Sequence, residues 1–252
     1  MKPVHGLILL LLLITVGFVP GCSTGISLRE IAREDPAGGD RYVRTGQGGG
    51  FVRVFRDGRP IESERGMALQ PGDEIETASN GAAVIYFANQ GEVVAAGATR
   101  VRIGSLEVLF GRVFAKVRGL FTISSENVVA GVEGTSFMFQ LEPGPSVRVA
   151  VADGTVICRP RVGASWAPLR LSPGQELAAR FPTRGPLAAE PASPAVLEEI
   201  SRWLQQVSKA PGQGYCCEGG RVFPAFSTQC RGEFRWNQQD ARIVCTVMEP
   251  GC

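Results

Sequence analysis

Short runs of β-branched and apolar residues, separated by turn-forming residues, dominate the chain from residue 51 to residue 180. The pattern is clearest in residues 126–157, where Thr135, Phe137 and Phe139 occupy alternate positions. Alternation with period two is typical of a half-buried β-strand. Gly134, a Pro-Gly-Pro run and Asp153-Gly154 interrupt these runs, as turn residues do. The pattern predicts at least three short strands in this stretch.

Further strands are predicted at short intervals before it. They cover residues 51–55, 82–87, 92–95, 99–103, 106–110, 113–117 and 120–123. Strands this short and this evenly punctuated predict a mainly β domain over residues 51–180, either a solenoid-like β-roll or a sandwich. We expect the β-roll, because strands adjacent in sequence often pair with one another.

Residues 1–21 have the pattern of a secretory signal peptide. Lys2 and His5 form a basic start, and residues 6–18 are almost wholly apolar, a core too short for an ordinary membrane span. Residues 19–22, Val-Pro-Gly-Cys, resemble the bacterial lipobox, in which the cysteine is acylated. The resemblance implies lipidation of Cys22 and, because Ser23 follows it, sorting to the outer membrane. The alternative is an ordinary signal peptide beside a chance cysteine, and Pro20 is atypical of the motif.

Residues 22–50 are predicted to form a flexible tether. Ser27 and Glu30 have the spacing of a helix cap, so one short helix is expected there. Glycine and proline in residues 36–39 and 46–50 are typical of irregular structure. The second run lacks the flanking strand and helix of a dinucleotide-binding loop, so we expect a linker rather than a nucleotide site.

A second linker is predicted over residues 181–193, which are rich in proline and alanine. Ser193-Pro194 then has the sequence of a helix start. Apolar residues recur on one face of this helix, at Val196, Leu197, Ile200, Trp203, Leu204 and Val207. We expect this face to pack on the β domain or on the C-terminal segment. The alternative is a partner or membrane surface.

Five of the seven cysteines lie after residue 215. The disulfide candidates are Cys158, Cys216, Cys217, Cys230, Cys245 and Cys252. In an exported chain this density predicts a small disulfide-stapled module, which together with the helix forms residues 194–252. If Cys22 is acylated, the other six thiols suffice for three bridges, whose pairing the sequence leaves open. The absence of C-x-x-C pairs disfavours zinc and redox-active dithiols, so no metal site is predicted.

Composition narrows the chemistry further. The chain carries 26 basic and 24 acidic residues, a balance that argues against a nucleic-acid partner. The only histidine, His5, lies in the predicted signal peptide, so the mature chain lacks the usual base of serine and cysteine nucleophiles. Paired carboxylates remain as an alternative, either Glu126 with Glu133 or Asp73 with Glu74. Adjacent strand residues face opposite sides, which disfavours the second pair. We predict no catalytic residues and no cofactor.

Residues 51–178 resemble the FecR domain family of bacterial extracytoplasmic β-rich domains. The matching segments are Leu69 to Thr77, Ala130 to Phe137, Asp153 to Val156 and Leu171 to Gln175. The resemblance implies an extended β architecture. It also assigns a motif, for folding or for binding, to Gly72, Asp73, Gly131, Gly134, Thr135, Phe137, Asp153 and Gly154. The family is known best from regulators that sense the occupancy of iron transporters.

We therefore expect a non-catalytic envelope lipoprotein, anchored in the outer membrane and facing the periplasm, whose β domain binds an unidentified envelope protein or glycan. The alternatives are an enzyme acting on envelope polysaccharide and a purely structural spacer. Regulators of the family carry a cytoplasmic segment that binds a sigma factor, followed by a membrane-spanning helix. Nothing in this sequence matches either part, so direct anti-sigma activity is not expected.

Overall fold

The computed structural model describes residues 25–37, 42–144, 146–161, 166–183, 186–209, 213–218, 221–227, 229–231, 233–235 and 238–247. The predicted signal peptide, Cys22 and Cys252 lie outside these residues. None of the helices in the described part is long and apolar enough to cross a membrane.

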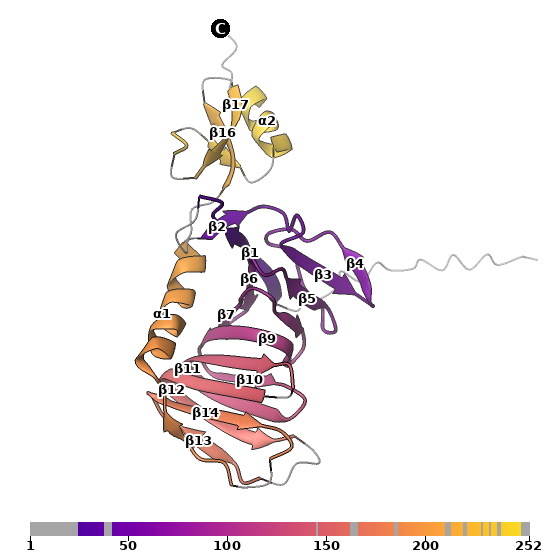
Figure 1. The fold of residues 1–252 in the computed structure, drawn as a ribbon. Helices are drawn as coiled ribbons and strands as arrows, with labels where there is room; N and C mark the ends of the chain where they lie inside the picture. The colour runs from indigo at the N-terminus through magenta and orange to yellow at the C-terminus, as the bar shows by residue number, and fades with distance from the viewer. Residues whose placement is uncertain are drawn as a thin grey trace, which may run out of the picture.

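The elements follow one another as strands, one helix, further strands and a last helix (Figure 1). They are β1 (Ile26–Glu34), β2 (Tyr42–Thr45), β3 (Val52–Arg56), β4 (Arg59–Ile61), β5 (Glu74–Thr77), β6 (Gly81–Phe87), β7 (Gly91–Ala95), β8 (Arg100–Arg102), β9 (Leu106–Val117), β10 (Leu120–Ser124), β11 (Val128–Glu142), β12 (Ser146–Pro160), β13 (Leu169–Leu171), β14 (Gln175–Arg180), β15 (Glu190–Pro191), α1 (Pro194–Lys209), β16 (Gln213–Glu218), β17 (Arg221–Phe226), β18 (Glu233–Arg235) and α2 (Gln238–Val247).

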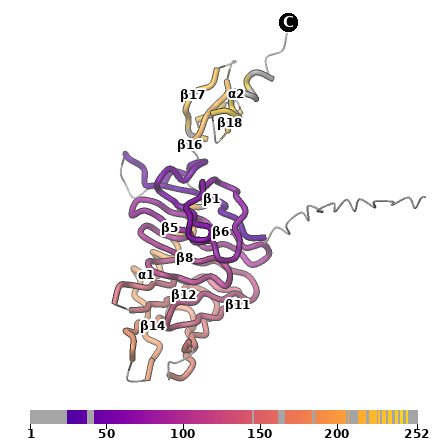
Figure 2. The backbone as a smooth tube through the Cα atoms, turned by 90° about the vertical axis from the view of Figure 1, so that its right-hand side faces the viewer, coloured from indigo at the N-terminus to yellow at the C-terminus, as the bar shows by residue number. Residues whose placement is uncertain are grey.

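The β domain is one hydrogen-bonded sheet that folds over on itself. The first half of β11 pairs with β10, whereas its second half pairs with β9. In the same way, β12 pairs with β14 at its start and with β13 near its end. The long strands therefore pass from one layer to the other, and Figure 2 shows them stacked as successive rungs. This mainly β arrangement confirms the predicted fold class, in its β-roll form.

The strands of the central stretch are longer than the sequence predicts. Residues 128–142 and 146–160 form two strands of 15 residues each, and Gly134 and Gly154 lie inside them. Both glycines have positive φ, 58° and 83°, and the β11–β12 register shifts beside them. The expectation that these glycines end strands is wrong, because a β-bulge bends a strand without ending it.

Side chains fill the space between the two layers. Phe137, Phe139 and Ile85 enter this core from one layer, and Ile75 and Ile123 enter it from the other. All five are fully buried. The interior of the β domain is thus a packed core, and its other buried members are mostly valine, leucine and alanine.

Helix α1 covers the outer face of one layer (Figure 1). The Trp203 ring stacks on Phe114 with centroids 5.3 Å apart and lies 5.0 Å from the Tyr42 ring. An ion pair of 2.6 Å joins Glu199 to Arg112 of β9. The expectation that the apolar face packs on the chain's own β domain is confirmed. The helix accordingly belongs with that domain rather than with the C-terminal module.

The predicted tether is in large part folded. Residues 26–34 form β1, which pairs with β6 and β2, and Leu28 and Ile31 are fully buried. The short helix expected at Ser27 is therefore a strand. Its register shifts between Leu28 and Glu30, so the apolar spacing on either side of this bulge imitates helical spacing. Gln47, in the second predicted irregular run, bridges to Glu64.

The second predicted linker also contributes to the sheet. Residues Glu190–Pro191 form β15, which pairs with Gln175 and Glu176 of β14. Phe181, at the start of the same segment, is buried in the core beside Trp166. The described parts of residues 181–193 therefore pack against the β domain instead of merely spacing it from the helix.

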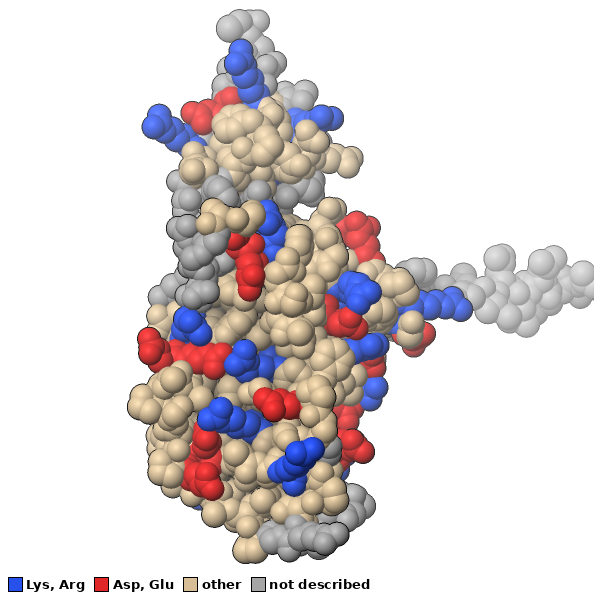
Figure 3. Space-filling model, in the orientation of Figure 1, with Lys and Arg blue, Asp and Glu red and all other residues tan. Residues whose placement is uncertain are grey.

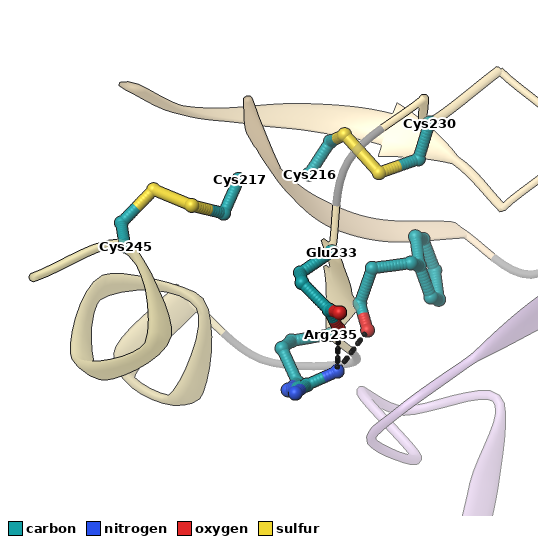
Figure 4. Close-up of a disulfide and its surroundings, with 7 residues drawn as sticks. Cys216, Cys217, Cys230, Glu233, Arg235 and Cys245 are labelled. Atoms are coloured by element: carbon teal, nitrogen blue, oxygen red, sulfur yellow. Dashed lines mark hydrogen bonds and ion pairs between the residues drawn. A yellow bond between two sulfur atoms is a disulfide. The ribbon is translucent and has the colours of Figure 1, made fainter. Parts of the chain in front are cut away.

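The C-terminal module is a three-stranded sheet, in the order β17-β16-β18, with α2 beside it. Disulfides join Cys216 to Cys230 and Cys217 to Cys245, as Figure 4 shows. Adjacent residues of a strand point to opposite faces, so the neighbouring cysteines of β16 reach different partners. The predicted disulfide-stapled module is confirmed.

Cys158 corrects one of the disulfide candidates. It is a free, fully buried thiol on β12, placed between Ala130 and Leu169 in the register of the sheet. The alternation of β12 turns this residue into the core, where no other cysteine of the described residues reaches it. Burial raises the pKa of the Cys158 thiol to about 12.

Candidate functional site

The central motif residues form a corner at which the strands change layer. The Thr135 hydroxyl lies 3.0 Å from the carbonyl oxygens of Glu133 and Thr155, and it accepts the Thr155 N–H at 3.3 Å. Gly154 passes so close that an added Cβ atom would lie 2.5 Å from the Gly134 carbonyl oxygen. Thr135, Gly134 and Gly154 thus join the bends of β11 and β12.

The same corner recurs one step along the stack. The Thr99 hydroxyl lies 3.1 Å from the Arg112 carbonyl oxygen and accepts the Arg112 N–H at 2.9 Å. A Cβ atom at Gly111, the residue before Arg112, would lie 2.5 Å from the Thr99 Cα atom. The Thr77 hydroxyl in turn accepts the Thr99 N–H at 2.9 Å. A column of threonine hydroxyls therefore fastens successive bends.

The other motif residues have separate places. Phe137 is fully buried in the core. Gly131 lies in the middle of β11, opposite Thr122 and Ile157. Asp153 is exposed and pairs in register with Ser136 at the bulge. The structure does not gather these residues into a single ligand site.

Asp73 is bound within a turn. Its carboxylate accepts hydrogen bonds from Arg56 at 2.9 and 2.7 Å and from the Gln70 N–H at 2.8 Å. Gly72 precedes it with φ of 94°, and the Gly72 N–H donates to the Ile103 carbonyl at 2.8 Å. Burial of Asp73 disfavours its charge, but these hydrogen bonds outweigh that effect and lower the pKa of the carboxyl below its ordinary value. Asp73 is therefore an ionised structural residue.

Glu74 belongs to a charged network on the outer face of β5, β8 and β9. Arg100 and Arg102 bind its two carboxylate oxygens at 2.6 and 2.7 Å. Burial disfavours the Glu74 charge, yet the two guanidinium groups lower the pKa of the carboxyl. The network continues from Arg100 to Glu76 and on to Arg53. It also continues from Arg102 to Glu107 and on to Arg161. On the face in Figure 3, both signs of charge are interspersed over the β domain.

Glu126 and Glu133 are not brought together. Glu133 pairs with Leu120 at one end of the β10–β11 hairpin, whereas Glu126 follows β10 at the other end, beyond Ser124 and Val129. Four residue steps of strand separate Val129 from Glu133, roughly 13 Å at the rise of a β-strand. Glycosidase carboxylates are about 5–10 Å apart, so this pair does not have the geometry of that chemistry.

A polar cleft of about 900 Å³ separates the β domain from the C-terminal module. Its lining includes Gln47 and Glu64 on one side and Tyr215, Gln238 and Arg242 on the other. On the first side Gln47 follows β2 and Glu64 follows β4, and the residues named on the second side come from β16 and α2. Sequence reasoning missed this site, because its two walls are far apart in the chain and lack a shared motif. Within the described residues, no cluster of three or more histidine, cysteine or acidic side chains is placed to hold a metal ion.

Comparison with known proteins finds a family match within the β domain. Residues 73–157 match the family described as FecR protein, which confirms the resemblance over this part of the chain. Two crystal structures of a candidate anti-sigma factor from Parabacteroides distasonis, at 1.65 and 2.50 Å resolution, are similar at 18% identity and a TM-score of 0.43. Each match covers 52% of this chain and 64% of that protein. A search of curated proteins finds no match.

Proposed function

We propose that the protein, whose residues 73–157 match the FecR protein family, is a lipid-anchored, non-catalytic regulatory module of the bacterial envelope that binds a protein partner. The arrangement of its candidate catalytic carboxylates supports a non-catalytic role. Arginines hold Asp73 and Glu74, and Glu126 and Glu133 lie at opposite ends of a hairpin. Neither candidate pair of carboxylates thus has the arrangement of a glycosidase acid–base pair.

The envelope location rests on two features. Cys22 lies in a lipobox-like sequence shortly before β1. The two acyl chains of a diacylated cysteine anchor a protein stably in a membrane, whereas a single chain does not. Two disulfides in the C-terminal module fit an oxidising compartment such as the periplasm. We therefore place the domain at the periplasmic side of the outer membrane, held by lipid on Cys22.

The cleft between the β domain and the C-terminal module is the proposed binding surface. It presents the amides of Gln47 and Gln238, the ring of Tyr215, and one charge of each sign at Glu64 and Arg242. Such a lining suits a polypeptide segment, whose backbone offers donors and acceptors along its length. A wall glycan is the competing ligand, and the experiment distinguishes the two.

The test is cross-linking of the tagged, full-length protein in its native envelope, followed by mass spectrometry of the captured material and of the mature N-terminus. We expect one dominant envelope protein, together with acylated Cys22. Recovery of peptidoglycan or polysaccharide without a protein would replace the proposal with a wall-binding role. Recovery of neither would favour a structural spacer, and an unmodified Cys22 would refute the lipid anchor alone.

A further inference from the structure

The end of the β domain where β1 begins differs from the rest of its surface. The Ala88 N–H donates to the Gly25 carbonyl at 2.7 Å, which fixes the start of the described chain beside the turn after β6. In the next turn, the Arg118 N–H donates to the Gln90 carbonyl at 2.6 Å, and the Gln90 side chain donates to the Leu120 carbonyl at 3.0 Å. Gly25 and the turns after β6 and β9 therefore form one end surface.

This end surface is basic. A hollow of about 410 Å³ is lined by Arg29, Tyr86, Asn89, Glu92, Lys116 and Arg118. Arg29 lies 3.6 Å from Glu92 and stacks over the Tyr86 ring at 5.3 Å. Within the described part of the chain, Lys116 and Arg118 have no ion-pair partner. Three cations and one carboxylate thus line this hollow, whereas the carboxylates over β5 and β8 are all paired with arginines.

An exposed apolar side chain lies at the same end. Leu120 is 75% exposed, more than Phe110 at 39% or Phe223 at 40%, the other large exposed apolar residues of the described chain. Leu120 is the first residue of β10, directly after Arg118 and Gly119, and pairs in register with Glu133 of β11. An exposed apolar residue beside cations is the arrangement that interfacial membrane-binding surfaces use.

The short segment between Cys22 and β1 indicates which ligand lies near this surface. Three residue steps join Cys22 to Gly25, so the two Cα atoms are at most about 11 Å apart. That distance is close to the Debye length at physiological salt, about 8 Å, so headgroup charge still acts on the domain. A folded β1, in place of the predicted tether, leaves the domain little freedom to move away from its anchor.

We propose that this end surface docks on the anionic phospholipid headgroups of the leaflet that holds the Cys22 acyl chains. The inference rests on the proposed lipid anchor. Arg29, Lys116 and Arg118 bind phosphate groups, and Leu120 inserts among the headgroups. Docking gives the domain one orientation on the membrane. The cleft beside the C-terminal module then also has one fixed orientation relative to the membrane surface.

The test uses residues 22–252 with Cys22→Ser, which lack the predicted signal peptide and cannot be acylated at residue 22, and vesicles of phosphatidylcholine with or without phosphatidylglycerol. At low ionic strength, cosedimentation should occur with the phosphatidylglycerol vesicles and weaken with added salt. Since a surface cation contributes about 1 kcal/mol near an anionic membrane, Arg118→Gln should lower the affinity about fivefold. Leu120→Ser should lower it as well.

Matched controls lie far from this end. Arg170→Gln removes an exposed cation of β13, and Phe223→Ser removes an exposed apolar residue of β17. Both should leave vesicle affinity unchanged. Equal binding to both kinds of vesicle, no binding to either, or an equal loss with Arg170→Gln would overturn the proposed surface. Because the tested chain carries no lipid, these outcomes are independent of whether Cys22 is acylated in the wild-type protein.

Discussion

Thr135 and Gly154 meet where β11 and β12 bend, and a Cβ atom at residue 154 would lie 2.9 Å from the Thr135 Cα atom and 2.8 Å from its hydroxyl. The hydroxyl fastens the bend by bonding to Thr155, the residue that follows the glycine. Thr99 and Gly111 repeat the relationship through Arg112. In this chain, Gly134, Thr135 and Gly154 of the FecR-like motif therefore turn the strands from one layer to the other.

Gly154→Ala should destabilise the β domain more than Gly174→Ala. Both glycines have positive φ, 83° and 78°, so each alanine bears the backbone penalty of about 1–2 kcal/mol. Of the two positions, only residue 154 also has neighbouring atoms that a Cβ would clash with. Such overpacking adds about 1–3 kcal/mol to the loss of stability. Urea denaturation of the two variants measures the difference. Equal losses of unfolding free energy would show that the close approach to Thr135 is unimportant.

Thr135→Val should destabilise the protein by about 1–3 kcal/mol. Valine keeps the shape of threonine, but it removes the buried Thr135 hydroxyl and so leaves the half-buried Thr155 N–H without that partner. Thr135→Ser retains the hydroxyl and should lose less. Denaturation curves of both variants provide the comparison, and a valine variant as stable as the serine variant would contradict the proposed role of the hydroxyl.

Acid should weaken the fold through Asp73 and Glu74. The folded state lowers the pKa of both carboxyls, so they add stability above their unfolded pKa values of about 4, and this contribution is lost as pH falls through the lower folded values. The free energy of unfolding should therefore decline from about pH 5 downwards. Asp73→Asn should flatten that decline, as should Arg56→Gln, which removes the partner. Identical pH profiles for wild type and Asp73→Asn would contradict this account.

Reduction should unfold the C-terminal module and spare the β domain. The module depends on the bridges Cys216–Cys230 and Cys217–Cys245, which close chain separations of 14 and 28 residues. The β domain has its own packed core and no disulfide among its described residues. Hydrogen exchange with and without dithiothreitol should show protection lost in residues 213–247 and kept in β11 and β12. Loss of protection in both regions would mean that the two units fold as one.

The sequence predicts the fold class well, because strand periodicity depends only on local alternation. It fails at bulges. The register shift between Leu28 and Glu30 gives β1 an apolar spacing that is typical of a helix. The bulges at Gly134 and Gly154 have the sequence of turns. The pairing of each corner threonine with its glycine does not follow from the sequence, because Thr99 lies 12 residues before Gly111 (111 − 99), whereas Thr135 lies 19 residues before Gly154 (154 − 135).

The cysteines and the cleft show the same limit of local patterns. The alternation of side chains along β16 explains why its neighbouring cysteines bond to different partners. It does not reveal that Cys158 lies in another core, out of reach of the module. The cleft joins residues near 47 and 64 to residues near 215 and 240, and only the folded chain brings them together.

Site-specific photo-cross-linking from the cleft tests the proposed binding function most directly. A photoreactive amino acid at Gln238, in the full-length protein in its native envelope, should capture the same dominant protein that whole-molecule cross-linking recovers. The same amino acid at Arg170, on the exposed side of β13, should not capture it. Equal capture from both positions, or capture from Arg170 alone, would contradict a binding site in the cleft between the β domain and the C-terminal module.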